Sequence, residues 1–194
     1  KVQNTAPIFE LPPSDRKECP GDLAANIQFK VTDSNTPAYM LEVTGVADEA
    51  PGIQKVELSF VKDVSGFFRA VNVKPIGTVY PSDVKITLTL TDDSNDPLST
   101  TVNFTVTYKD DTPPVITTSL PLPNKDENIS SSAGCKFTVT DYTGLITATD
   151  ICTGVTITQS PAAGTELSVS HNDTKTITLY ATDGYLNKSE TQFT

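Results

Sequence analysis

The residues of this sequence best suited to chemistry are acids that stand at the ends of expected strands. Asp110 and Asp111 precede the proline phrase "TPPVI", while Asp141 and Asp183 each end an apolar alternation. Carboxylates placed together repel one another unless a hard cation lies between them, and Ca²⁺ takes about six to eight oxygen ligands of this kind. The pattern therefore predicts a calcium site formed by these four aspartates at a joint between two domains.

Earlier in the chain, Asp33, Asp92 and Asp93 occupy equivalent places and form a second candidate calcium set. The alternative reading is structural. Aspartate side chains in loops commonly bond to nearby backbone N–H groups and keep the loop hydrated. Both readings stay open at this point.

Other side chains give little support for catalysis. The single histidine, His171, lies in the polar stretch "SHNDTK", and no nucleophile is paired with a base in a recognisable motif. We therefore expect no enzymatic activity. Phe67, Phe68 and Tyr142 are candidates for stacking on a sugar ring, although core packing is the commoner use of such residues.

The charge balance excludes one class of partner. The chain has 14 Lys and Arg against 24 Asp and Glu, for a formal net charge of -10. A field of this sign repels phosphate backbones, so we expect no nucleic-acid partner. No apolar run approaches the roughly 20 residues that span a bilayer, and no basic and apolar leader opens the chain. We expect no membrane insertion, with any export signal removed or upstream.

Alternation of apolar and polar residues predicts strands rather than helices. Residues 84–90 and 102–108 each place an apolar side chain at every second position, mostly with threonine between. Residues 91–97, "TDDSNDP", separate these runs and contain turn formers, so the pair reads as a hairpin.

The chain also repeats itself. "ITLTLTDDSNDPLSTTVNFT" from Ile86 resembles "ITLYATDGYLNKSETQFT" from Ile177, and the phrase "FKVTD" that ends at Asp33 resembles "FTVTD" that ends at Asp141. The matching segments occur in the same order in both halves of the chain, which indicates two copies of one module. We therefore expect domains at residues 1–110 and 111–194, joined by the stiff segment Thr112–Pro114.

Each module has about seven short expected strands, as in an immunoglobulin-like β-sandwich. In the first module they lie near residues 7–11, 27–33, 40–47, 55–62, 67–74, 84–91 and 101–108. In the second they lie near residues 114–118, 135–141, 145–149, 154–160, 166–170, 175–182 and 189–194. The fold class is therefore all-β, with two tandem sandwiches and a short proline-rich linker.

The second module resembles the hyalin-repeat (HYR) family of extracellular surface proteins, in the version found in bacterial surface adhesins. The resemblance is carried by "DDTPPVI", "CKFTVTDYTGLITATDIC", "VTITQSPAAGTEL" and "ITLYATDGYLNKSE". It implies an immunoglobulin-like fold and a place in a long adhesin. The first module is similar only in a general way to cadherin and immunoglobulin-like surface repeats.

The same resemblance implies a Cys135–Cys152 disulfide. Such a bridge would close a loop of roughly 16 to 18 residues and stabilise the module by about 3 kcal/mol. It also implies an oxidising, extracellular location. Cys19 is then left over, either buried and free or paired outside this sequence. The family's other bridge is absent, since Thr117 and Thr118 stand where a cysteine often follows the opener.

These observations predict non-catalytic adhesion or spacer modules of a large cell-surface protein, with Ca²⁺ at the joint. The expected partners are adjacent modules of the same chain and an unidentified protein or glycan. The alternative is a carbohydrate-binding or accessory module of a secreted enzyme, in which Phe67, Phe68 and Tyr142 would contact the sugar.

Overall fold

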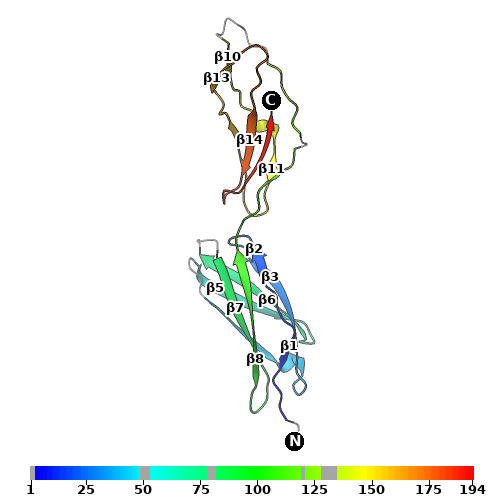
Figure 1. Cartoon of the computed structure of the whole chain (residues 1–194). Helices are drawn as coiled ribbons and strands as arrows, with labels where there is room; N and C mark the ends of the chain where they lie inside the picture. Colours follow the sequence, from blue (N-terminus) through cyan, green and yellow to red (C-terminus); the bar gives the residue numbers. More distant parts are fainter. Residues whose placement is uncertain (1–2, 49–52, 78–81, 119–120, 128–134) are drawn as a thin grey trace. The chain divides into compact units, whose positions relative to one another are not determined.

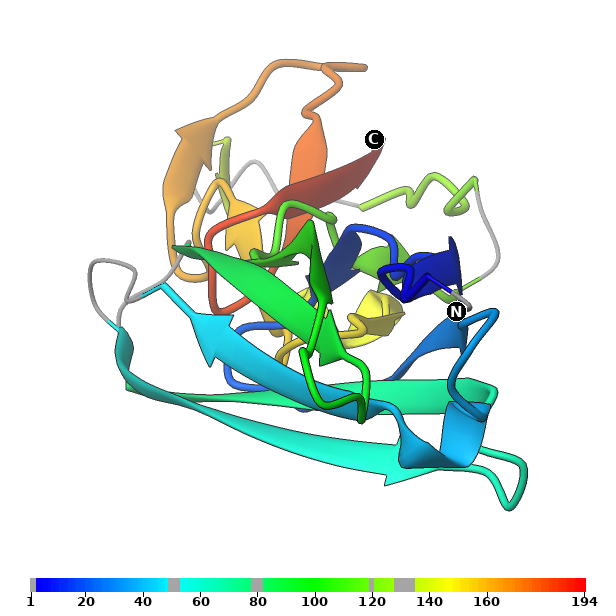
Figure 2. The ribbon, with the colours of Figure 1, turned by 90° about the horizontal axis from the view of Figure 1, so that it is seen from below.

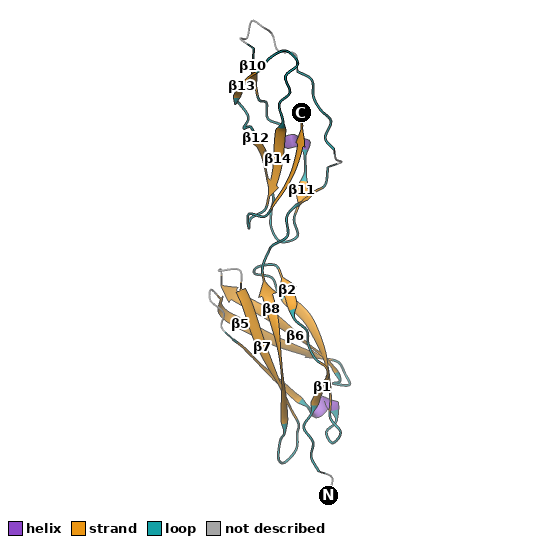
Figure 3. Cartoon of the chain, viewed as in Figure 1, coloured by secondary structure: helices purple, strands orange, loops and turns teal. Residues whose placement is uncertain are grey.

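The chain divides into two compact units, Lys1–Asp110 and Asp111–Thr194. The computed structural model describes residues 3–48, 53–77, 82–118, 121–127 and 135–194. Each unit has its own hydrophobic core. Strands and loops make up the described residues apart from short 3₁₀ turns (Figure 3). The chain is all-β, as the alternation predicted.

The first unit is a sandwich of two four-stranded sheets (Figure 1). One sheet has the order β1-β3-β6-β5 and the other has the order β2-β8-β7-β4. The strands are β1 (Ile8–Leu11), β2 (Arg16–Glu18), β3 (Ala24–Thr32), β4 (Glu42–Ala47), β5 (Ile53–Lys62), β6 (Phe68–Gly77), β7 (Ser82–Thr91) and β8 (Ser99–Tyr108). Figure 2 shows β5 and β6 side by side in one layer and β7 in the other.

Alternation explains how the first core forms. Along β7, Val84, Ile86, Leu88 and Leu90 are completely buried, whereas the residues between them face outward. Facing strands contribute the same pattern, because side chains of a strand alternate between the two faces of its sheet. The other fully buried members of this core include Phe29, Val31, Val71, Val73, Val106 and Tyr108.

Strand β2 was not expected from the sequence. It pairs parallel with β8, with Arg16 opposite Val106 and Glu18 opposite Tyr108. Its three residues are all charged and offer no apolar alternation. The strand exists because backbone groups at the edge of β8 find partners there, a feature that side-chain patterning does not report.

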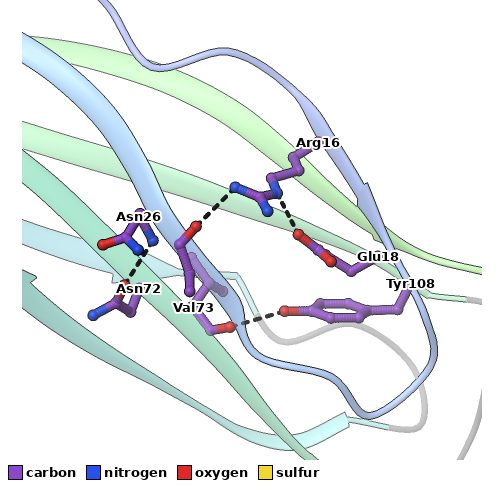
Figure 4. A network of polar contacts seen from close by, with 7 residues as sticks. Arg16, Glu18, Asn26, Asn72, Val73 and Tyr108 are labelled. Atoms are coloured by element: carbon purple, nitrogen blue, oxygen red, sulfur yellow. Dashed lines mark hydrogen bonds and ion pairs between the residues drawn. The ribbon is translucent and has the colours of Figure 1, made fainter.

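Polar contacts hold the two sheets together near the end of β8 (Figure 4). The hydroxyl of the buried Tyr108 donates to the carbonyl oxygen of Val73 on β6 at 3.0 Å. Arg16 pairs with Glu18, and its guanidinium also donates to the carbonyl oxygen of Ala25 at 2.7 Å.

The second unit has shorter strands arranged in three small sheets. Their pairings are β12-β14-β15, β10-β13 and β9-β11. The strands are β9 (Val115–Ile116), β10 (Lys136–Thr138), β11 (Ala148–Thr149), β12 (Thr156–Ser160), β13 (Glu166–Ser168), β14 (Ile177–Thr182) and β15 (Lys188–Phe193), with the 3₁₀ turn η3 (Thr143–Leu145) before β11. Its core gathers Leu122, Val139, Tyr142, Ile146, Ile177, Leu179 and Phe193.

Short 3₁₀ turns are the helical elements of the described residues. The first unit has one at η1 (Ala38–Met40), between β3 and β4. In the described part of the chain, no helix has the length and apolar character needed to cross a membrane.

Candidate cation-binding loops

In the first unit, the loops after β3 and β7 are tied together by the segment that precedes β1. The Asn4 side-chain amide donates to Asp92 Oδ2 at 2.8 Å and to Ser94 Oγ at 2.9 Å. The next residue, Thr5, donates its N–H to Asn35 Oδ1 at 3.1 Å. The two loops that carry Asp33 and Asp92 therefore converge where the first strand begins.

Asp92 is a buried carboxylate whose charge is compensated by hydrogen bonds. The residue is only 4% exposed. Besides the Asn4 amide, the N–H groups of Ser94 and Leu98 both donate to its Oδ1 at 3.2 Å. Burial by itself raises the pKa of Asp92, but the hydrogen bonds from Asn4, Ser94 and Leu98 outweigh it and hold the pKa below its ordinary value.

Asp33 leaves one oxygen for another ligand. Its Oδ1 accepts the N–H groups of Asn35 and Thr36, both at 2.7 Å, whereas its buried Oδ2 has no hydrogen-bond partner. A buried carboxylate oxygen without a donor is costly unless a cation or water satisfies it. Asp93, in contrast, is exposed. Among the described residues, Asp33, Asp92 and Asp93 do not gather into a compact three-carboxylate ligand set.

In the second unit, Asp183 closes the β14–β15 hairpin. Asp183 is 5% exposed, and its carboxylate accepts the N–H groups of Tyr185 at 2.8 Å and Asn187 at 2.9 Å. The Asn187 side-chain amide donates to the second oxygen at 2.8 Å. Burial by itself raises the pKa of Asp183, but the hydrogen bonds from Asn187, Tyr185 and Leu186 hold the pKa below its ordinary value.

The expected meeting of Asp141 with Asp183 is wrong. Asp141 belongs to a turn in which Thr143 donates its hydroxyl at 2.7 Å and its N–H at 2.9 Å to Oδ1, and these bonds lower the pKa of Asp141. The adjacent Tyr142 packs on Phe193, which pairs with Ile177 at the start of β14. Asp183 follows the other end of that strand.

Asp150 occupies the place that was expected for Asp141. It directly follows Thr149, the partner of Val115 in the β9–β11 pair. Its Oδ1 accepts the N–H groups of Cys152 and Thr153 at 2.8 and 3.1 Å. The Thr153 hydroxyl then accepts the N–H of Gly184 at 2.9 Å, so the Asp150 loop lies against the Asp183 hairpin. The available signal was the phrase "TATD", which resembles the "YATD" before Gly184.

The linker acids differ in exposure. Asp110, at the end of the first unit, is 8% exposed, and Asp111, at the start of the second, is exposed. A calcium ion shared by Asp110, Asp111 and Asp183 stays a prediction.

The expected Cys135–Cys152 disulfide is wrong. Cys135 is an exposed free thiol, whereas Cys19 and Cys152 are disulfide-bonded. The resemblance to hyalin repeats implied a pairing within the second unit, with Cys19 either free or paired outside this sequence. A disulfide is therefore present, but it does not use Cys135.

Of the aromatic candidates, two are exposed and one is not. Phe67 is 40% and Phe68 is 54% exposed, so core packing, the commoner use of such residues, does not apply to these two. Tyr142 is only 6% exposed and makes an edge-to-face contact with Phe193, with ring centroids 5.1 Å apart. Its ring therefore belongs to the core of the second unit and cannot stack on a sugar without unpacking it.

A buried arginine fixes the turn that presents these phenylalanines. The Arg69 guanidinium donates to the carbonyl oxygens of Gly66 at 3.0 Å, Ala38 at 2.8 Å and Leu41 at 2.7 Å. The β5–β6 turn is thereby held against η1. On the neighbouring strand, the Lys30 ammonium lies 5.6 Å from the centre of the Phe68 ring.

Comparison with known proteins returns solved structures only. No protein-family model and no curated protein matches the chain. A Drosophila N-cadherin EC1-4 structure is 18% identical, with a TM-score of 0.41, and the match covers 98% of this chain and 49% of that one. A mouse clustered PcdhgC3 EC1-3 structure is 17% identical, with a TM-score of 0.41, covering 97% and 66%. Human CDH23 EC21-23 is 14% identical, with a TM-score of 0.39, covering 99% and 64%.

The chain thus spans about half to two thirds of the length of these cadherin fragments. At these identities and TM-scores the likeness carries no argument about function. The assignment to immunoglobulin-like sandwiches rests on the chain's own sheets, and membership of residues 111–194 in the hyalin-repeat family stays a prediction.

Proposed function

We propose that the two units are non-catalytic modules of a large extracellular surface protein, where they act as spacers and adhesion modules. The observation that carries this proposal is a repeated structural unit. Asp92 and Asp183 occupy matching phrases of the sequence, each directly follows the first strand of a hairpin, and each is buried and held by three hydrogen-bond donors. Duplicated compact units joined in series are the architecture of spacers.

Calcium binding is part of the proposal for the first unit. The orphan Oδ2 of Asp33 is a ligand atom that awaits a partner, and the Ser94 hydroxyl and the Asp96 carbonyl oxygen belong to the neighbouring loop. Oxygen donors of these kinds suit Ca²⁺. A second calcium ion, bound by Asp110, Asp111 and Asp183, is proposed only because carboxylate oxygens are ligands that Ca²⁺ prefers. The alternative to calcium binding is a structural role, in which Asp141 and Asp183 stabilise the turns that contain them through hydrogen bonds to residues of the same turn.

Calcium titration tests this part of the proposal. We expect millimolar Ca²⁺ to raise the melting temperature of the whole chain and to change its maximum dimension in small-angle scattering. Asp33→Asn should reduce the thermal effect, because it removes a negative charge from the open ligand atom. Asp173→Asn is the matched control, since Asp173 pairs with Lys175 in a turn after β13. An unchanged melting temperature in the unsubstituted chain would remove calcium from the proposal.

A carbohydrate-binding module of a secreted enzyme is the second candidate, and the exposure of Phe67 and Phe68 favours it. Two adjacent exposed aromatic side chains on a turn held by Arg69 offer a firm surface for stacking on a sugar ring. A glycan array with the unsubstituted chain, Phe67→Ala and Phe68→Ala tests it. Binding that is lost in both variants supports the module, and an array without binding rejects it.

A further inference from the structure

Strand β5 has ten residues and lies at the edge of its sheet. Among the described strands, β6 is its single hydrogen-bonded neighbour, so its other edge is open. A long exposed edge displays backbone N–H and C=O groups that another strand can pair with. We propose that this edge pairs antiparallel with the same strand of a second copy of the chain, and that the twofold axis passes through Ser59.

The register of the β5–β6 hairpin shows which backbone groups face the open edge. The Asp63 N–H donates to the carbonyl oxygen of Phe68 at 3.0 Å, so Asp63 points its backbone groups toward β6. In an antiparallel pair this orientation recurs at every second residue, so Val61, Ser59, Glu57 and Lys55 also bond to β6. The intervening residues, Val56, Leu58, Phe60 and Lys62, point their N–H and C=O groups outward.

Pro75 supports this assignment independently. Proline has no N–H to donate, and Pro75 lies opposite Val56 in the hairpin. Because Val56 is one of the outward-facing residues, the β5–β6 ladder has no hydrogen bond to lose at that pair.

Charge selects the second copy as occupant and Ser59 as the centre. Lys55 already pairs with Glu57 of its own strand at 3.0 Å. With the axis at Ser59, Lys55 of each copy also lies opposite Asp63 of the other, which adds two ion pairs between the copies. An axis at Phe60 would set Glu57 against Asp63 of the second copy, and an axis at Glu57 would set two glutamates opposite each other. An axis at Leu58 would set Lys55 opposite the uncharged Val61 and would make no ion pair. Like charges directly opposite destabilise a strand pair, whereas opposite charges stabilise it.

The same register covers apolar surface. Phe60, which is 40% exposed, would lie opposite Leu58 of the second copy, and both side chains point to the core side of the sheet. The chain's Lys62 lies opposite Val56 and meets no like charge. An edge of this length buries less area than a stable dimer interface of roughly 1,200 Å² or more, so we expect a weak dimer that repeated modules would strengthen by multivalency.

Cysteine crosslinking tests the register in the full chain. In a Cys135→Ser background, which removes the exposed free thiol, Ser59→Cys places two thiols at the centre of the pair. Residues at a pair without hydrogen bonds have Cα atoms about 4.5 Å apart, within the range for a disulfide. Glu57→Cys is the matched control, because it lies on the same face of the same strand but opposite Val61 of the second copy.

We expect a mild thiol oxidant to crosslink Ser59→Cys at least about tenfold faster than Glu57→Cys. Equal or faster crosslinking of Glu57→Cys would overturn the register. Absence of crosslinking in both variants, with a chain that stays monomeric in sedimentation velocity up to millimolar concentration, would overturn the proposal.

A charge reversal tests the partner. Lys55→Glu sets a glutamate opposite Asp63 in both pairs and should weaken the dimer about tenfold or more. Lys74→Glu makes the same change in net charge on the adjacent strand β6 and should leave the dimer unchanged. Equal weakening by both substitutions would contradict pairing at the β5 edge. Neither substitution touches the loops that carry Asp33 and Asp92, so this test is separate from the calcium titration.

Discussion

The Tyr108 hydroxyl donates to the Val73 carbonyl oxygen at 3.0 Å, and this hydrogen bond joins strands of opposite sheets inside the first unit. Both residues are completely buried. Tyr108→Phe keeps the ring but leaves a buried carbonyl without this donor, so we expect a loss of about 1 to 2 kcal/mol in the free energy of unfolding. Urea unfolding measures it. Tyr39→Phe, at a residue 60% exposed, is the control and should change little.

A second prediction concerns the buried Arg69. Its guanidinium donates to three carbonyl oxygens, those of Gly66, Ala38 and Leu41. Arg69→Met keeps a long side chain but leaves these acceptors without their donor. We expect a loss of about 3 kcal/mol, measured by denaturant unfolding. Lys62→Met, at the exposed residue opposite Arg69 on β5, should cost far less. Equal losses in the two variants would mean that the three bonds contribute little.

Two glycines with positive φ separate backbone strain from steric clash. A Cβ at Gly66, where φ is +76°, would lie 2.6 Å from the Tyr39 Cα, whereas a Cβ at Gly164, where φ is +84°, would meet nothing within 4 Å. Gly164→Ala should therefore lower the free energy of unfolding by about 1 kcal/mol, which is the cost of holding a residue with a Cβ at positive φ. Gly66→Ala should cost about 1 to 3 kcal/mol more, because η1 must move. Melting temperatures of the two variants give the comparison.

Acid should destabilise the first unit through Asp92. The folded-state pKa of Asp92 lies below its ordinary value, so the native state binds the proton less readily than the unfolded chain does. The stabilisation is therefore fully present above the unfolded pKa of about 3.9 and is lost as the pH falls through the lower folded pKa. Melting temperature against pH checks this. Asp92→Asn should lower stability at neutral pH and flatten the acid limb of the curve.

The strands of both units were predictable because a sandwich core imposes a period of two on the sequence. The runs at Val84–Leu90 and Val102–Tyr108 show this period clearly, and both form long strands. Strand β2 escaped prediction because a charged edge strand is held by its backbone, and backbone pairing leaves no mark on side-chain polarity. The edge strands β1, β4 and β5 were predicted because they carry apolar side chains at the core, whereas the all-charged β2 was not.

The candidate loops were predicted in part. The Asp33 and Asp92 loops converge because the C-terminal ends of β3 and β7, which they follow, lie at the same end of the sandwich. The error at Asp141 arose because strand β10 ends at Thr138, after which the chain passes through the core at Tyr142 and η3 before it reaches the Asp150 loop. Cysteine pairing and the exposure of Phe67 and Phe68 depend on contacts between distant segments, and local pattern does not encode these.

The parallel pairing of β2 with β8 bears on how the first unit would respond to tension. Tension on the N- and C-terminal ends of the first unit pulls β2 and β8 in opposite directions along their shared strand axis. Arg16–Glu18 and Val106–Tyr108 must then slide past each other. Hydrogen bonds loaded in this way resist together instead of opening one after another. Under tension, the three charged residues of β2 would therefore have to separate from β8 before the first unit could unfold.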